Sequence, residues 1–458
     1  MSFPRYPAYK HSRIEQLGDV PEHWEVVPVK RCLKSITQGW SPQCENYPAD
    51  SGQWGVLKVG CVNGRSFDPS ENKALPSTLE PLPELSIRRG DVLVSRANTR
   101  ELVGSVAVAE RDYERLMLCD KLYRLRVDEQ RCDAAFLASS LSTPAARGVI
   151  EATASGASSS MLNIGQAAIT GMFIAVPPLK EQQALVAFVQ NEAAKIDALA
   201  EEQRRLIELL KEKRQAVISQ AVTKGLNPSA PMKDSGVKWL GEVPAHWGMT
   251  KLKHLVAESV AGPYGASLTK DMYTSSGYRV YGQQQVIPDD FTVGDYYISE
   301  AKFDEMRRYS VYKGDVLVSV MGTIGKVAVV PGDVEPGIIN PRLVRYRCSE
   351  CIRPRYLQRV LLSQKHQEHL LFEAKGTTMD GLNMSTLGKV PVPVPPLAEQ
   401  AQIVEWLSSI QDETDALVVE AEKAAALLLE RRAALISAAV TGKIDVRGLV
   451  PQPEAVAA

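Results

Sequence analysis

"VPPLKEQ" occupies residues 176–182 of the chain, and "VPPLAEQ" occupies residues 394–400. The two segments begin 218 positions apart, which is nearly half of the 458 residues. Repeats that build solenoids or propellers have periods of roughly 20–50 residues. The much longer period of this chain therefore indicates a duplicated unit of domain size.

The repeat extends well beyond the Pro-Pro segment. Three further pairs of matching segments are "LGDVPEHW" (17–24) with "LGEVPAHW" (240–247), "RRGDVLVSR" (88–96) with "YKGDVLVSV" (312–320), and "KRQAVISQAVT" (213–223) with "RRAALISAAVT" (431–441). Between these anchors the copies diverge, chiefly within 30–175 and 255–392. We interpret this pattern as a constant frame that carries two variable inserts.

Each Pro-Pro pair is followed by a sequence that predicts a long helix. Proline disfavours a helix in the residue before it and tolerates a helix start after it. Apolar residues then recur at intervals of three and four, which is typical of a coiled coil. These seam residues are Leu185, Val189, Ile196, Leu199, Leu206, Leu210 and Val217 in the first copy, and Ile403, Leu407, Ile410, Leu417, Ala421, Ala424, Leu428 and Leu435 in the second.

The expected length of each helix is about 40 residues, or about 60 Å at 1.5 Å per residue. Glycine closes each helix, at Gly225 and at Gly442. Since two equal units follow each other in one chain, we expect the helices to pack antiparallel and to set the spacing of the two inserts. The alternative is two amphipathic helices that pack on separate globular cores.

Composition places the chain among globular proteins. Apolar residues make up 45% and charged residues 23%, and the net charge is −1. The sequence contains no stretch of about 18 apolar residues, so we expect no membrane span. The first residues have no apolar core, so we expect no signal peptide. Seven cysteines, an odd number, fit a reducing compartment, so we expect a cytoplasmic protein. The near-zero charge means that any nucleic-acid binding must depend on a local patch.

The inserts combine short strands with a few helices, so the fold class is α+β. Runs rich in β-branched and aromatic residues between turn residues predict strands at 54–60, 90–96, 104–110, 121–127, 278–282, 295–299, 314–320, 325–330 and 342–347. Short helices are expected around 133–141 and 353–371.

Polar residues in the predicted turns are candidates for DNA contact. Asn and Gln can bond adenine bidentately, Arg does the same with guanine, and Ser, Thr and Lys suit phosphate oxygens. The candidates are Lys58, Asn63, Arg65, Arg96, Asn98, Arg100, Ser158, Ser159 and Ser160 in the first insert, and Gln283, Gln284, Gln285, Thr323, Lys326, Thr377 and Thr378 in the second. The Arg-rich run "RLVRYR" (342–347) is expected to add electrostatic attraction.

No motif for catalysis appears in the sequence. A phosphate-binding loop, a dinucleotide fingerprint and a nucleophile elbow are all missing. Cys348, Cys351, His366 and His369 approach zinc-finger spacing, but the two histidines are one residue too close, so a core thiol and helix-surface histidines are favoured over a metal site. His23 and His246, which recur in both Pro-x-His-Trp segments, are expected to be structural.

The whole chain resembles the specificity subunit of type I restriction–modification systems. The resemblance rests on "VPPLxEQ", "LGxVPxHW", "GDVLVS", "SRANTRELVG" (95–104), "GPYGASL" (262–268) and the Leu-Asn pairs at 162–163 and 382–383. It implies two pseudo-symmetric target recognition domains joined by two long antiparallel coiled-coil helices. Each domain is expected to read one half of an asymmetric, bipartite sequence in double-stranded DNA.

The resemblance also implies that the chain has no catalysis of its own and binds no cofactor or metal. Usually two methyltransferase subunits, together with restriction subunits, are the expected partners, and S-adenosylmethionine, ATP and Mg belong to those partners. The alternative function is a coiled-coil scaffold without a DNA role. The expected segments are 1–19 (N-terminal segment), 20–178 (target recognition domain 1), 179–224 (spacer helix 1), 225–242 (linker), 243–396 (target recognition domain 2), 397–443 (spacer helix 2) and 444–458 (tail).

Overall fold

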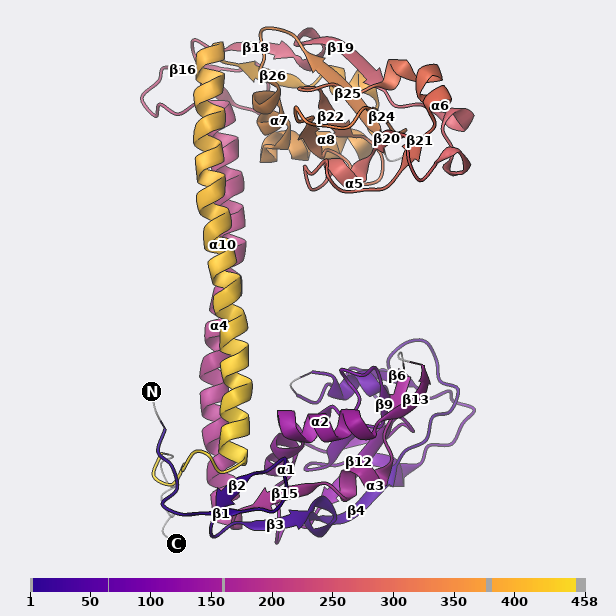
Figure 1. The fold of residues 1–458 in the computed structure, drawn as a ribbon, viewed down its shortest axis with the longest axis vertical. Helices are drawn as coiled ribbons and strands as arrows, with labels where there is room; N and C mark the ends of the chain where they lie inside the picture. Colours follow the sequence, from indigo (N-terminus) through magenta and orange to yellow (C-terminus); the bar gives the residue numbers. More distant parts are fainter. Residues whose placement is uncertain (1–2, 65, 159–160, 376–380, 450–458) are drawn as a thin grey trace. The chain divides into compact units, whose positions relative to one another are not determined.

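The computed structural model describes residues 3–64, 66–158, 161–375 and 381–449 (Figure 1). Its residue contacts divide the chain into two compact units. Unit 1 comprises Met1–Gln203 and Lys423–Ala458, and unit 2 comprises Arg204–Glu422. Each unit therefore contains one insert and one end of each long helix, and each is a mixture of helices and sheets.

Unit 1 is built around an antiparallel sheet with the strand order β10-β8-β12-β4. A second sheet has the order β6-β5-β11-β7, and a third has the order β13-β14-β9. The strands are β1 (Tyr9–His11), β2 (Asp19–Pro21), β3 (Glu25–Pro28), β4 (Leu33–Gln38), β5 (Gly55–Leu57), β6 (Asn72–Ala74), β7 (Ser86–Ile87), β8 (Val92–Ser95), β9 (Ala97–Asn98), β10 (Val106–Val108), β11 (Tyr113–Met117), β12 (Leu122–Val127), β13 (Ser155–Ser158), β14 (Met161–Asn163) and β15 (Phe173–Val176). The helices are α1 (Ala134–Leu141), α2 (Pro144–Thr153), α3 (Gln166–Thr170) and the start of α4 (Leu179–Lys224).

Unit 2 repeats this plan with the sheet order β19-β25-β22-β23 and a second sheet β21-β20-β24. Its strands are β16 (Met232–Asp234), β17 (Glu242–Pro244), β18 (Gly248–Lys251), β19 (Val256–Ala261), β20 (Tyr278–Tyr281), β21 (Tyr297–Ile298), β22 (Val316–Ser319), β23 (Val327–Val329), β24 (Gly337–Ile339), β25 (Leu343–Cys348) and β26 (Pro391–Val394). Its helices are α5 (Gln283–Val286), α6 (Glu300–Glu305), α7 (Pro354–Leu362), α8 (Gln364–Lys375), α9 (Met384–Gly388) and the start of α10 (Leu397–Val440). The predicted strands are confirmed, and the predicted helix at 353–371 is two helices separated at Ser363.

The repeated Glu-Gln pair explains why the Pro-Pro segment occurs twice. In unit 1 the Glu181 carboxylate accepts hydrogen bonds from the Trp24 indole at 3.0 Å and from His23 at 2.8 Å. In unit 2 the Glu399 carboxylate has the same partners, Trp247 at 3.1 Å and His246 at 2.8 Å. The structural role expected for the two histidines is therefore confirmed.

The glutamine of each pair fixes the entry to a helix. The Gln182 side chain accepts from the Asp133 amide at 2.8 Å and donates to the carbonyls of Arg131 and Pro177, each at 2.9 Å. Gln400 repeats this in unit 2, with the Arg353 amide at 2.8 Å and with two backbone carbonyls at 3.0 and 2.9 Å. Both glutamines are fully buried, so their amides must be satisfied within the fold. The segment thus joins the long helix to the insert in each copy.

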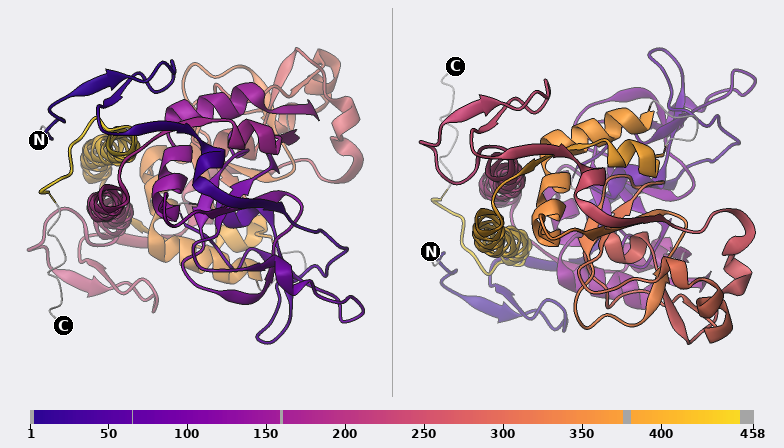
Figure 2. Two further views of the ribbon diagram at one scale, coloured as in Figure 1. Left: turned by 90° about the horizontal axis from the view of Figure 1, so that it is seen from below. Right: turned by 90° about the horizontal axis from the view of Figure 1, so that it is seen from above.

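The two long helices pack antiparallel, as expected. In unit 1 the first part of α4 lies against the last part of α10, where the Arg432 guanidinium pairs with Asp197 at 3.0 Å. In unit 2 the last part of α4 lies against the first part of α10, where Arg214 pairs with Asp415 at 2.6 Å. The end-on views of Figure 2 show the helices side by side. The apolar residues at the ends of both helices also belong to the hydrophobic cores of the inserts. The helices therefore pack on each other, as in a coiled coil, and also on globular cores, as in the alternative.

At two places along α4 the buried seam residue is the one directly after the predicted seam residue. Leu199 and Leu206 are 48% and 43% exposed, whereas Ala200 and Ile207 are buried. Positions 199 and 200 both satisfy a spacing of three or four from Ile196, so the periodicity alone does not separate them. The structure buries the small Ala200 and leaves the leucines on an exposed flank. On α10 the predicted seam residue Leu417 is likewise 54% exposed.

Glycine ends both helices in the predicted way. Gly225 follows α4 with φ +73°, and Gly442 follows α10 with φ +76°, a conformation that other residues rarely adopt. A Cβ at Gly442 would also clash with Pro21 at 2.3 Å. Within the described ranges, no helix has the length and apolarity that a membrane crossing requires.

Candidate nucleic-acid interface

Two asparagines from separate turns of unit 1 lie together. Asn98 belongs to β9, directly after the central strand β8, and its amide donates to the Asn63 side-chain oxygen at 2.9 Å. The same amide lies 3.3 Å from the Ser95 hydroxyl, and its oxygen accepts from the Thr99 amide at 2.9 Å. Asn63 itself is exposed. The structure therefore brings two sequence-predicted residues, 35 positions apart, to one exposed point.

The third sheet of unit 1 adds the serine-rich segment to this region. Strand β14 pairs with β9 so that Leu162 lies opposite Asn98, and β13 continues the sheet with Ser158 opposite Met161. Ser158 is thus placed by its backbone beside the asparagine pair. The Leu162-Asn163 segment holds this ribbon in position.

The other cationic side chains predicted to contact DNA in unit 1 differ in whether they are bonded within the chain. Lys58 forms an ion pair with Glu71 at 3.1 Å, and the Arg96 guanidinium donates to the Asp120 carbonyl at 3.1 Å. Arg100 is exposed in the loop after β9. Arg65, Ser159, Ser160, Thr377 and Thr378 lie outside the described residues.

In unit 2 the corresponding position is occupied by Gln283. Its side-chain nitrogen donates to the Ser319 hydroxyl at 2.7 Å and to the Met321 carbonyl at 2.6 Å, and it lies 3.2 Å from the Thr323 carbonyl. Its side-chain oxygen accepts from Arg342 at 3.3 Å. Gln283 and the exposed Thr323 are therefore together, on elements that correspond to those of Asn63 and Asn98. Lys326 directly precedes the return strand β23, and its carbonyl accepts from the Ser319 amide at 2.8 Å.

The three consecutive glutamines have three different environments. Gln284 is exposed, whereas Gln285 is buried at 2% exposure. The Gln285 side chain accepts from the Gly282 amide and donates to the Val293 carbonyl, both at 2.8 Å. Since both ends of this amide are used inside the fold, the structure contradicts Gln285 as a base-contacting residue. The reason is that Gln285 is the third residue of the short helix α5, where its side chain turns back to the backbone amide of the N-cap residue Gly282.

The arginine-rich run also requires a correction. Arg345 is 2% exposed and pairs with Asp315 at 3.2 Å and with Glu258 at 2.9 Å. Arg347 pairs with the same carboxylates at 3.0 and 2.8 Å, and its hydrogen bond to Asp315 raises its pKa above the ordinary arginine value. These two arginines therefore stabilise the sheet, and Arg342, the exposed first member of the run, is the one beside Gln283.

The four residues that approached zinc-finger spacing do not converge in the structure. His366 is fully buried, with one ring nitrogen 2.9 Å from the Ser363 hydroxyl and the other 3.0 Å from the Pro391 carbonyl. Burial lowers its pKa to about 4. His369 stacks on Trp239, and Cys351 lies 3.0 Å from the Ser349 hydroxyl. In the part of the chain that the structure describes, no group of three or more potential metal ligands is present.

Comparisons with known proteins agree with this arrangement. The family model for the type I restriction modification DNA specificity domain matches residues 268–425. The EcoKI specificity subunit of Escherichia coli K12 is 21% identical over 449 residues, which cover 95% of this chain and 92% of that subunit. The chain is thus similar to type I restriction–modification specificity subunits over nearly its whole length. The scaffold alternative is not supported.

Other known proteins align more locally or only in fold. The E. coli EcoEI specificity subunit is 29% identical over 178 residues, but these cover only 39% of this chain and 30% of that subunit. A solved structure, titled as the structural basis of complex assembly and conformational transition of the type I restriction–modification system, superposes with a TM-score of 0.67 at 18% identity. The superposition covers 92% of this chain and 98% of that chain, so the two share a fold over nearly their whole lengths.

Proposed function

We propose that the chain reads a bipartite, asymmetric DNA sequence, with one half of the target read by each unit. The observation that supports this most is the contrast within the duplication. The Glu-Gln frame is identical in both units, whereas the exposed cluster beside the central strand is Asn63 with Asn98 in one unit and Gln283 with Arg342 in the other. Amide and guanidinium groups are the side chains that discriminate bases in the major groove.

Each cluster would exchange some of its hydrogen bonds when DNA binds. In the free chain the amides bond to one another or to nearby carbonyls, which keeps them oriented. A base edge would replace the Asn98–Asn63 bond in unit 1. In unit 2 it would replace the bond from Arg342 to the Gln283 side-chain oxygen and the bonds from the Gln283 side-chain nitrogen to Ser319 and Met321. Lys58, Arg96, Arg100, Lys326 and the serines and threonines of the same loops would bind phosphates.

We further propose that the chain binds methyltransferase and restriction subunits and carries out no chemical step itself. Support comes from the exposed apolar flanks of the long helices, with Leu199, Leu206 and Leu209 on α4 and Leu417, Val419 and Leu427 on α10. Large apolar residues on exposed helix surfaces are typical of protein interaction sites. S-adenosylmethionine, ATP and Mg would act in those partners.

The function is tested by methyl transfer and DNA binding together. The purified chain should transfer no methyl group from S-adenosylmethionine to DNA until methyltransferase subunits are added. In the assembled complex, Gln283→Ala should weaken binding of the specific sequence by about 1–3 kcal/mol, because a bidentate base contact is lost. The control is Gln402→Ala, which removes an exposed amide from α10 and should leave the affinity unchanged. Methylation by the lone chain, or equal effects of the two substitutions, would contradict the proposal.

A further inference from the structure

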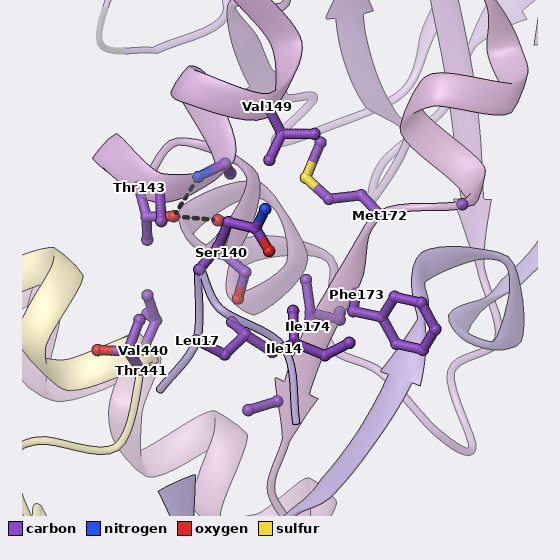
Figure 3. Close-up of a pocket in the computed structure, with 15 residues that line it drawn as sticks. Ile14, Leu17, Ser140, Thr143, Val149, Met172, Phe173, Ile174, Val440 and Thr441 are labelled. Carbon is purple, nitrogen blue, oxygen red and sulfur yellow. Dashed lines mark hydrogen bonds between the residues drawn. The ribbon is translucent and has the colours of Figure 1, made fainter. Parts of the chain in front are cut away.

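Unit 1 contains a cavity of about 200 Å³ (Figure 3). It lies between the turn that precedes β2, helix α2, strand β15 and the last turn of α10. Its apolar walls are formed chiefly by Ile14, Leu17, Val149, Met172, Ile174 and Val440. Among the described residues that line it, none is charged.

The two units can be compared at this place residue by residue. The turn has the same hydrogen bonds in both copies: the Leu17 amide donates to the Ile14 carbonyl at 3.0 Å, and the Leu240 amide donates to the Val237 carbonyl at 2.9 Å. Gln16 and Trp239 therefore occupy the same position, one residue before the leucine.

The contacts of the two buried glutamines allow helices α1 and α2 of unit 1 to be aligned with helices α7 and α8 of unit 2. Gln182 binds the Asp133 amide, and Gln400 binds the Arg353 amide, at the residue that precedes α1 or α7. Counting forward from these residues, Ala146 corresponds to His366 and Val149 corresponds to His369.

In unit 2 this place is filled by three rings. The Trp239 indole stacks on the His369 imidazole with centroids 4.6 Å apart and planes at 20°. It also meets the His366 ring edge-on at 5.1 Å. Unit 1 has Gln16, Val149 and Ala146 at these three positions, so the turn, helix and strand border a partly open space that no ring of these three residues fills.

We propose that this cavity binds one uncharged planar aromatic molecule of about the size of indole. An apolar cavity of about 150 Å³ is already sufficient for benzene, so the larger space suits a bicyclic ring. The uncharged lining excludes an ionic ligand, because an ion would lose its hydration without a partner. The ring must come from outside the chain, since no aromatic residue is present among the residues that the structure leaves undescribed.

The test uses 5-fluoroindole as the probe, with its fluorine resonance observed in the presence of the full chain. Saturable binding with one site per chain is expected, and unlabelled indole should displace the probe. Gln16→Trp should abolish binding, because the new indole takes the place that Trp239 has in unit 2. The matched control is Glu15→Trp, which adds the same side chain at an exposed neighbouring position that does not line the cavity, and which should bind as the parent does.

A second variant tests the same inference in unit 2, where the three rings occupy the equivalent place. Replacing Trp239 by Gln and His369 by Val should open the equivalent space in unit 2 and raise the stoichiometry from one site to two. Because these changes could impair folding, the result counts only if the Gln16→Trp arm has been measured. Absence of saturable binding, or equal binding by Gln16→Trp and Glu15→Trp, would overturn the proposal. Binding that appears only after removal of residues 450–458 would also overturn it, in favour of the tail as occupant.

Discussion

The two units share a frame and differ in the polar clusters beside their central strands and in the residues at the place of the unit 1 cavity. Glu181 and Glu399 bind the same Trp-His pair, and Gln182 and Gln400 bind the same backbone groups. Beside the central strands, however, one unit has paired asparagines and the other has a glutamine beside an arginine. Residues that recur in the two copies hold the fold, and we propose that the divergent clusters beside the central strands bind DNA.

The largest expected effect concerns the buried aspartate of the repeated Gly-Asp segment. Asp315 is 1% exposed and pairs with the buried Arg345, so Asp315→Ala should destabilise unit 2 by about 3–5 kcal/mol. The matching change in unit 1, Asp91→Ala, should cost about 1–2 kcal/mol, because its partner Arg126 is 34% exposed and can rehydrate. Urea unfolding of protein labelled with 5-fluorotryptophan reports each unit, through Trp24 and Trp247. Equal losses in the two units would contradict this account of the sheets.

A smaller difference is expected at the repeated glutamate. Glu181 accepts a third hydrogen bond, from the Tyr6 hydroxyl at 2.6 Å, and it is more buried than Glu399. Burial and this carboxylate also raise the pKa of Tyr6 above its ordinary value. Glu181→Ala should therefore cost about 3 kcal/mol and Glu399→Ala about 2 kcal/mol. The same fluorine signals measure both, and in the Tyr6→Phe background the two costs should become similar.

The third prediction uses the histidine that only unit 2 has. Burial lowers the pKa of His366 to about 4, below the ordinary value of 6.5, so the unfolded chain binds the proton more readily than the folded chain. The stabilising contribution is complete above pH 6.5 and is lost as pH falls from 6.5 towards 4, by up to about 3 kcal/mol. Unit 1 has Ala146 at this position and should show no such contribution.

Urea midpoints of the Trp24 and Trp247 signals at pH 7 and pH 5 measure this difference. The gap between the two midpoints should change with pH in the parent and should change less in His366→Ala. A gap with the same pH dependence in that variant would show that other groups cause it.

Much of the fold could be predicted because the duplication gives two readings of one pattern. The strands, the long helices and the glycines that end them follow from local periodicity and turn residues, which both copies repeat. The α4 seam could not be fixed in the same way, since Leu199 and Ala200 fit the spacing equally and only packing buries the smaller residue. Local periodicity does not predict which residues make long-range contacts.

The candidate site was less predictable for the same reason. Residue type and turn position predicted Asn63, Asn98 and Gln283 as DNA-contacting residues, and the fold brings them to the ends of the central strands. The sequence offered no signal that Gln285 turns inward to the backbone of Gly282 and Val293. It also did not show that Arg345 and Arg347 meet Asp315, because that partner lies 30 or more residues away in the chain. Arg342 could have been singled out by its place at the start of the run, before the alternation of β25 begins.

The central claim, that each unit reads its own half of the target, is tested most directly by exchanging one insert. Residues 255–392 would be replaced by the corresponding insert of a related specificity subunit, in cells that supply the methyltransferase subunits, and the methylated sequences would be determined across the genome. We predict that one half of the recognised sequence changes and the other half is retained, and that exchanging residues 30–175 has the opposite outcome. An active variant in which both halves change, or neither does, would contradict the claim.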